Sequence, residues 1–159
     1  MRESIIKYSI EMLLRDGLRF SIDEVAKTLK ISKKTIYRFF PTKERLAIEI
    51  YNTYYENALR EIEILSKTQS KDAAAQMLYI YYRSHCMVRE EIFNKYAINA
   101  SIRTLAQTNH NRIRMFIENL PSPADRQAVM IIIDGALQKL YENKDEEEKV
   151  IARLVSFIC

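Results

Sequence analysis

Two helix-start signals lie only eleven residues apart near the beginning of this chain, which leaves little freedom for the segment between them. Ser21 followed by Glu24 forms a capping box, so a helix is expected to begin at Ile22. Ser32 can cap a second helix running from residue 33 to about residue 40, where Pro41 ends it because proline cannot continue the backbone hydrogen bonding. The stretch predicts a helix, a tight turn and a second helix.

The second of these helices has two unlike faces. At 100° per residue, Ile36 and Phe40 point to one side, into the groove between the helices, while Lys34 and Arg38 point to the other. The outward face is flanked by Thr35 and Tyr37. Such a face suits the DNA major groove, where cations reach phosphates or guanine edges and threonine contacts a base edge. A solvated surface with extended lysines is the alternative for a basic helix taken alone.

A longer pattern around these helices resembles the DNA-binding domain of TetR-family transcriptional regulators. The family spacing is matched by Gly17, Ser21, Val25, Ala26, Thr35, Ile36, Tyr37, Phe40, Lys43 and Glu44. The sequence departs from the pattern at Lys30, where the family's turn usually has glycine, and at Lys34, where a small residue is common. A lysine at the first of these positions is expected to take a strained positive φ.

The resemblance implies an all-α protein with a three-helix, helix-turn-helix DNA-binding domain over residues 1–45 and a helical effector-binding and dimerisation body over residues 46–159. It implies a homodimer that pairs through the last two helices, about residues 123–141 and 145–158, and binds a near-palindromic double-stranded DNA operator. The expected activity is that of a repressor released by a small molecule. The residues expected to contact DNA are Ser21, Ser32, Lys33, Lys34, Thr35, Tyr37, Arg38 and Lys43.

Composition and charge agree with this interpretation. Two glycines and three prolines leave few helix breakers, so a mostly helical fold is expected. Residues 1–45 hold 11 Lys and Arg residues against 6 acidic ones, a net +5, whereas the rest of the chain is near neutral at −1. A phosphate backbone would therefore attract the first third. Without a signal peptide or a long apolar run, we expect a cytoplasmic protein that does not enter the membrane.

The remaining helices follow from apolar spacing and breakers. A first helix is expected over residues 2–16, where Gly17 ends it. Thr42 is expected to cap a long helix from residue 43 to about 65, which could link the DNA-binding domain to the helical body. Further helices are expected over residues 71–93, 94–107 and 109–119. Ser122 is expected to cap the next helix, with Asp125 in its first turn, and Asp145 with Glu148 to cap the last.

The resemblance implies that the helices after residue 71 enclose a ligand pocket. These helices are rich in tyrosine and methionine, which would suit a flexible, partly polar cavity for a small apolar or aromatic effector. The candidate lining residues are Tyr81, Tyr82, His85 and Asn99. Ordinary core is the alternative for each of them and is favoured for any single one.

Other functions are weaker on the sequence. No catalytic residues, cofactor or metal are expected, because the chain has no Gly-rich phosphate loop and no metal-spaced Cys/His cluster. His85 and Cys86 are adjacent and diverge by 100° on a helix, so they cannot act on each other, and His110 is expected to be exposed. A helical interaction scaffold without ligand control is the main alternative; a small helical enzyme is the second.

Overall fold

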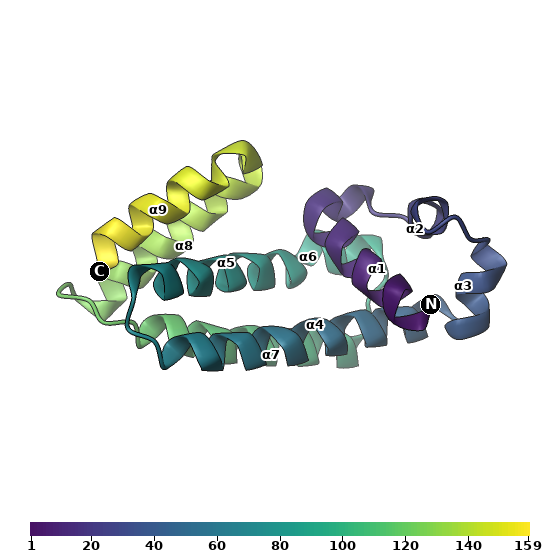
Figure 1. The fold of residues 1–159 in the computed structure, drawn as a ribbon, viewed down its shortest axis with the longest axis horizontal. Helices are drawn as coiled ribbons and strands as arrows, with labels where there is room; N and C mark the ends of the chain where they lie inside the picture. Colours follow the sequence, from purple (N-terminus) through teal and green to yellow (C-terminus); the bar gives the residue numbers. More distant parts are fainter. The chain divides into compact units, whose positions relative to one another are not determined.

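The computed structural model describes residues 1–159 except the side chains of Leu18, Tyr141 and Lys144. Every regular element in the described chain is helical, which confirms the all-α class (Figure 1). The elements in order are α1 Arg2–Asp16, the 3-10 turn η1 Gly17–Arg19, α2 Ile22–Thr28, α3 Lys33–Phe39, α4 Lys43–Ser66, α5 Lys71–Met87, α6 Glu90–Lys95, α7 Ala100–Glu118, α8 Arg126–Glu142, the 3-10 turn η2 Lys144–Glu146 and α9 Glu147–Ile158.

The chain folds as two compact units. The first unit combines residues 1–58 with residues 83–110, and the second combines residues 59–82 with residues 111–159. Helices α4, α5 and α7 therefore contribute residues to both units. The DNA-binding domain expected over residues 1–45 lies wholly within the first unit, and its boundary stays a prediction.

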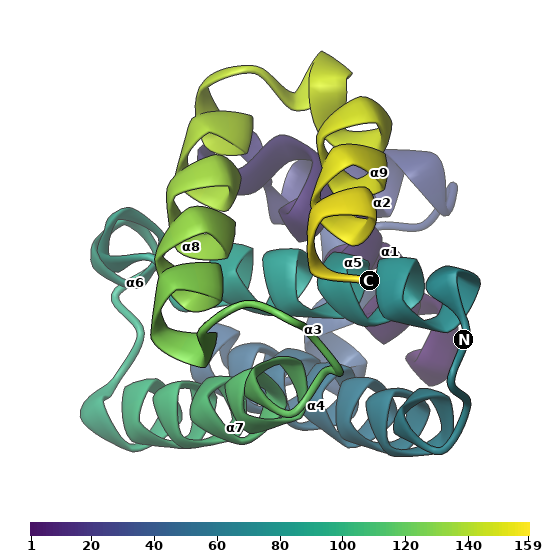
Figure 2. The same ribbon diagram turned by 90° about the vertical axis from the view of Figure 1, so that its left-hand side faces the viewer.

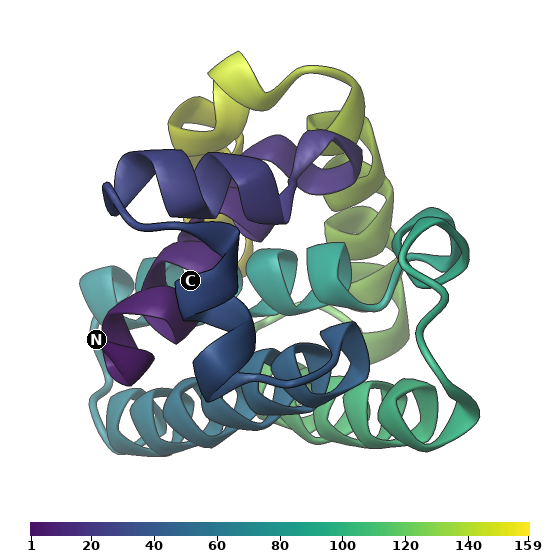
Figure 3. The same cartoon turned by 90° about the vertical axis from the view of Figure 1, so that its right-hand side faces the viewer.

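Helices α1, α2 and α3 form the head of the first unit, with α1 packed on α2 and α2 on α3 (Figure 3). The bounds of α1 match the sequence expectation, and Gly17 ends it with a positive φ of 52°. Side chains at helical spacing supply the apolar core of the head. They are Ile5, Ile6, Met12, Leu13, Val25, Ala26, Ile36 and Phe40. Burying each large side chain of this kind contributes about 1.5–3 kcal/mol to stability.

Helix α4 begins at the end of the head, where the Thr42 hydroxyl accepts a hydrogen bond from the Arg45 amide at 3.1 Å, as expected. In the first unit, two of its buried tyrosines bond carbonyls at the end of α5. Tyr51 donates to the Met87 carbonyl at 2.8 Å and Tyr55 donates to the Ser84 carbonyl at 3.5 Å. Burial raises the pKa of both phenols, which therefore stay protonated donors.

The helix expected over residues 71–93 is wrong, because α5 ends at Met87. Arg89 has an extended backbone, with φ −68° and ψ 133°, and begins α6. Helix α6 ends in a Schellman-type cap, since Ala97 has a φ of 48° and the Ile98 amide donates to the Phe93 carbonyl at 2.9 Å. No proline or glycine marks either break in the sequence.

The helices expected over residues 94–107 and 109–119 are one helix, α7. The Asn99 side chain accepts a hydrogen bond from the Ile102 amide at 2.9 Å and begins it. His110, expected to be exposed, is 9% exposed, and its Nδ1 lies 2.9 Å from the Ser84 hydroxyl. This hydrogen bond gives one nitrogen of the buried ring a polar partner.

In the second unit, α8 and α9 lie side by side as an antiparallel hairpin (Figure 2). Asp125 itself caps α8, accepting a hydrogen bond from the Ala128 amide at 3.0 Å, so its expected place in the first turn after a Ser122 cap is wrong. The cap expected from Asp145 and Glu148 is also wrong: η2 carries the chain to Glu146, which begins α9 without a side-chain cap bond.

No helix among the described residues is long and apolar enough to cross a membrane.

The turn between α2 and α3 gives a test of stored backbone strain. Lys30 has a φ of 54°, a conformation that glycine adopts without the steric penalty of a side chain. Lys30→Gly should raise the free energy of unfolding by about 0.5–1 kcal/mol, as measured by urea denaturation followed by circular dichroism. The control Lys27→Gly, inside α2, should lower it by about 0.5–1 kcal/mol. Destabilisation by both changes would contradict the strain at Lys30.

Candidate nucleic-acid interface

The candidate interface is the outward surface of α3, and local hydrogen bonds fix how α3 begins. At the end of α2, the Lys30 amide donates to the Lys27 carbonyl at 3.1 Å and the Ile31 amide donates to the Ala26 carbonyl at 2.9 Å. These two bonds form a Schellman cap, with Lys30 in the left-handed position. The chain therefore reverses within a few residues and enters α3 at a defined angle.

The two serines of the sequence signal act as helix caps. The Ser21 hydroxyl accepts a hydrogen bond from the Glu24 amide at 3.3 Å, and the Ser32 hydroxyl accepts one from the Thr35 amide at 3.1 Å. The Ser32 and Thr35 hydroxyls also lie 3.0 Å apart, within hydrogen-bond distance. Each hydroxyl carries a single proton and further acceptor capacity, so capping leaves room for a contact with a phosphate or a base.

Helix α3 has one buried apolar face and one exposed cationic face, as its sequence predicts. Ile36 is fully buried and Phe40, which caps the helix, is 2% exposed. On the other side Lys34 and Arg38 are exposed, and the flanking Thr35 and Tyr37 are half-buried. The Arg38 guanidinium lies 5.5 Å from the ring centre of Phe39, a cation–π distance that holds the arginine along the helix surface.

The cations of this surface differ in their partners. Lys33 forms an ion pair with Asp23 of α2 at 2.7 Å, and the hydrogen bond to this carboxylate raises the pKa of Lys33. None of the ion pairs in the described part of the chain involves Lys34, Arg38 or Lys43. These three exposed cations are therefore available to an anionic partner, while Lys33 also ties α3 to α2.

Two residues that position the head carry no local sequence signal. Arg2 pairs with Glu49 of α4 at 2.7 Å and lies 5.2 Å from the ring centre of Phe40, so it joins α1 to both elements beside it. Tyr96, after α6, has its hydroxyl 2.9 Å from the carbonyls of both Gly17 and Phe20. These partners lie far away in the sequence, beyond the reach of helix periodicity.

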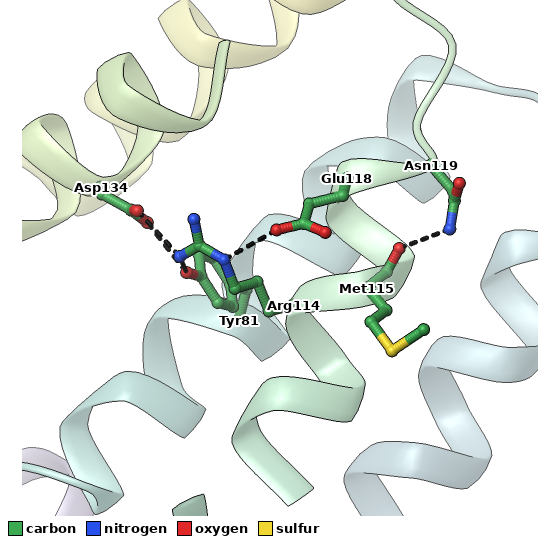
Figure 4. A network of polar contacts seen from close by, with 6 residues as sticks. All are labelled: Tyr81, Arg114, Met115, Glu118, Asn119 and Asp134. Carbon is green, nitrogen blue, oxygen red and sulfur yellow. Dashed lines mark hydrogen bonds and ion pairs between the residues drawn. The ribbon is translucent and has the colours of Figure 1, made fainter. Parts of the chain in front are cut away.

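The four predicted effector residues are divided between the units. In the second unit, Tyr81 donates to Asp134 at 2.8 Å, and the Arg114 guanidinium bonds Tyr81 and Asp134 at 2.8 Å each. Figure 4 shows Arg114 between Asp134 and Glu118 with the ring of Tyr81 beside it. Burial alone would lower the pKa of Arg114, but its bonds to Asp134 and Glu118 outweigh burial and raise it. Tyr82 is buried in the same unit.

The other two lie in the first unit. The His85 ring lies 5.3 Å from the His110 ring in an edge-to-face arrangement, and the Asn99 amide donates to Glu44 besides capping α7. A binding role for these four residues stays a prediction. Among the described residues, no group of three or more His, Cys, Asp or Glu side chains is placed to hold a metal ion.

A comparison with family models finds a similarity that covers the head and the start of α4. Residues 5–50 match the model of the bacterial regulatory proteins of the tetR family. Over this segment, the chain is similar to the TetR family. The matched segment contains all eight residues predicted to contact DNA, although their individual contacts stay predictions. The TetR family is a family of regulators rather than of enzymes.

One curated protein to which this chain is similar is an uncharacterized HTH-type transcriptional regulator, YuxN, from Bacillus subtilis (strain 168). The two are 32% identical over 83 residues, which cover 50% of this chain and 28% of that protein. The chain thus spans well under a third of the relative's length in this match. No solved structure matches the chain.

Proposed function

We propose that this TetR-family protein is a cytoplasmic, DNA-binding transcriptional repressor that binds a near-palindromic operator as a homodimer and is released by a small-molecule effector. The observation that carries the proposal is the exposed face of α3, where Lys34 and Arg38 lack acidic partners among the described residues while Ile36 anchors the opposite side. The family match over residues 5–50 supports the same function.

The dimensions of α3 suit the major groove. Its seven residues span about 10 Å, and a groove about 12 Å wide admits an α-helix. Lys34, Thr35 and Arg38 are the candidates for base edges, because they lie on the face opposite the core. Ser21, Tyr37 and Lys43 are the candidates for phosphates, which would set the register of the head on the duplex. Ser32 and Lys33, at the start of α3, are candidates for contacts of either kind, with base edges or with phosphates.

The outward side of α8 supports the homodimer. Ala128, Ile131, Ile132 and Gly135 follow one another at helical spacing on this side, and Ile131 is 67% exposed. A methyl group added at Gly135 would meet no atom within 4 Å, so a second helix could approach the backbone closely there. A glycine inside a helix costs about 1 kcal/mol relative to alanine, which close packing in a dimer would offset. Phe157 of α9 is also 49% exposed.

Effector control needs a ligand that binds the two states of the dimer with different affinities. Helix α4 offers a continuous connection, because it runs unbroken from Lys43, shortly after α3, to Ser66 in the second unit. In the second unit a cavity of about 450 Å³ is lined by Met115, Met130 and Arg114, a partly polar and adaptable lining.

The alternatives have less support. A helical scaffold would not require an exposed cationic face on α3. Nucleophilic catalysis would need an accessible nucleophile, and in the hydroxyl–imidazole pair of Ser84 and His110 the serine is 0% exposed.

Substitution of Arg38 tests the recognition face. Arg38→Ala should weaken binding to a selected operator duplex by about tenfold or more, because a base or phosphate contact of this kind is worth about 1–3 kcal/mol. Fluorescence anisotropy measures the affinity, and sedimentation velocity should show an unchanged dimer. Arg60→Ala, at an exposed arginine of α4, is the matched control and should leave the affinity unchanged. Equal affinities for both variants would remove Arg38 from the interface.

Substitution of Ile131 tests the dimer. Ile131→Glu should convert the dimer to monomers, because it places a charge at the centre of an apolar contact. Ile64→Glu is the matched control, since Ile64 of α4 is 61% exposed and lies outside the α8 face. Sedimentation velocity should find monomers for the first variant and dimers for the second. A dimer that survives Ile131→Glu would exclude this face as the interface.

A further inference from the structure

A partly open cavity of about 500 Å³ lies in the first unit, beneath the head. Residues from α1, the segment after η1, α2, α3, α4, α6 and the segment after α6 line it. Much of its wall is apolar and buried, and this part is formed by Leu13, Phe20, Leu46, Ile50, Ile92 and Ile98. The volume lies within the range of small-molecule sites, about 300–1,000 Å³.

Charged groups of the same cavity are mostly cationic. Lys33, Lys43 and Lys95 line it, and Asp23 is its one acidic lining residue in the described chain. Asp23 is engaged by Lys33 at 2.7 Å. Neither Lys43 nor Lys95 takes part in an ion pair within the described part of the chain. Two ammonium groups therefore remain to meet a ligand charge.

The tyrosines Tyr51 and Tyr96 of the lining supply ring surface rather than hydroxyl donors. The Tyr51 hydroxyl is bonded to the Met87 carbonyl, and the Tyr96 hydroxyl is bonded to the carbonyls of Gly17 and Phe20. The Lys95 ammonium lies 5.4 Å from the ring centre of Tyr96, so the cation and the ring share one side of the site. The polar recognition that this part of the cavity offers is positive charge beside apolar surface.

We propose that this cavity binds an amphipathic monoanion, an alkyl or aryl carboxylate, and that the bound anion competes with DNA. The apolar body lies against the isoleucine-rich wall and the carboxylate meets Lys43 and Lys95. An inorganic anion would leave the wall solvated, and a neutral apolar ligand would leave both ammonium groups without a counter-charge.

Competition follows from shared residues. Lys33, Tyr37 and Lys43 line the cavity and are also proposed DNA contacts. A carboxylate beside Lys43 neutralises a cation that is proposed to contact a DNA phosphate. A ligand against the start of α3 also favours conformations of the head that fit the ligand rather than the DNA major groove. The binding step stands by itself, whereas the competition step rests on the proposed DNA-binding function.

Binding is tested without DNA, by isothermal titration of the full chain with decanoate and, separately, with 1-decanol. Decanoate should bind with an affinity at least about tenfold higher than decanol, because only the carboxylate can pair with the ammonium groups of a partly buried site. Lys95→Gln should weaken decanoate binding about tenfold. Lys67→Gln, at an exposed lysine of the second unit, is the control and should not change it.

A second variant fills the cavity. Ala47 lines it and is half-buried, so Ala47→Leu should abolish decanoate binding. The same change at Ala152, an exposed alanine of α9 in the second unit, is the matched control and should leave binding unchanged. Should Ala47→Leu not fold, Lys95→Gln carries the test, because Lys95 is exposed. No decanoate binding, equal binding of decanol, or binding unaffected by both cavity variants overturns the site.

The competition step has its own readout. Decanoate should displace a selected duplex from the unmodified chain, and Lys95→Gln should need about tenfold more decanoate while its affinity for DNA stays the same. Decanoate that binds the cavity yet leaves DNA affinity unchanged overturns the competition and keeps the site. A chain that binds decanoate as expected but binds no duplex contradicts the proposed function instead.

Discussion

The burial of Ile36 and Phe40 determines which side chains of α3 face outward. Because these two residues are 0% and 2% exposed, the rotation of the short helix about its axis is fixed by the core of the head. Lys34 and Arg38 therefore point away from this core. The Ser32 cap and the reversal at Lys30 fix where the helix begins and how it leaves α2. Recognition therefore depends on apolar packing as much as on the cations themselves.

The head also contains a strained backbone position and hydrogen bonds between residues far apart in the sequence. Lys30 accepts a left-handed backbone where glycine would be unstrained, and Tyr96 ties η1 to the end of α6 through two carbonyls. The cavity beneath the head is bounded by this brace and by the start of α3. A ligand there would act on the elements that set the position of α3. The proposed anion site would then be coupled to the proposed DNA surface through the shared Lys33 and Lys43.

Local signals were sufficient to predict the head from the sequence. The caps at Ser21, Ser32 and Thr42 act within three residues. The positive φ of Lys30 was expected from the resemblance, because Lys30 stands where the family's turn usually has glycine. The all-α class was predicted correctly as well, and residues 5–50 match the model of the family that the sequence pattern resembles. The Ser122 cap failed because Asp125, three residues later, offered a competing oxygen to the first amides of α8.

Beyond the head, the deciding interactions were distant in the sequence. The break between α5 and α6 has no proline or glycine, and Tyr51, 36 residues earlier, bonds the carbonyl of Met87 where α5 ends. His110 was expected at the surface because its neighbours are polar, but its burial depends on Ser84. The Arg114 network likewise joins α5, α7 and α8 through Tyr81 and Asp134. Periodicity within one helix contains no information on such partners.

The central claim is that a pair of α3 helices, held by a dimer, reads two half-sites. Enrichment of bound duplexes from a random DNA pool, followed by affinity measurements at two salt concentrations, tests this claim most directly. The account predicts two half-sites related by a two-fold axis, with centres about 34–36 Å apart, and an affinity that falls steeply with salt. Enrichment of asymmetric sequences, or binding that is weak and indifferent to sequence, would contradict it.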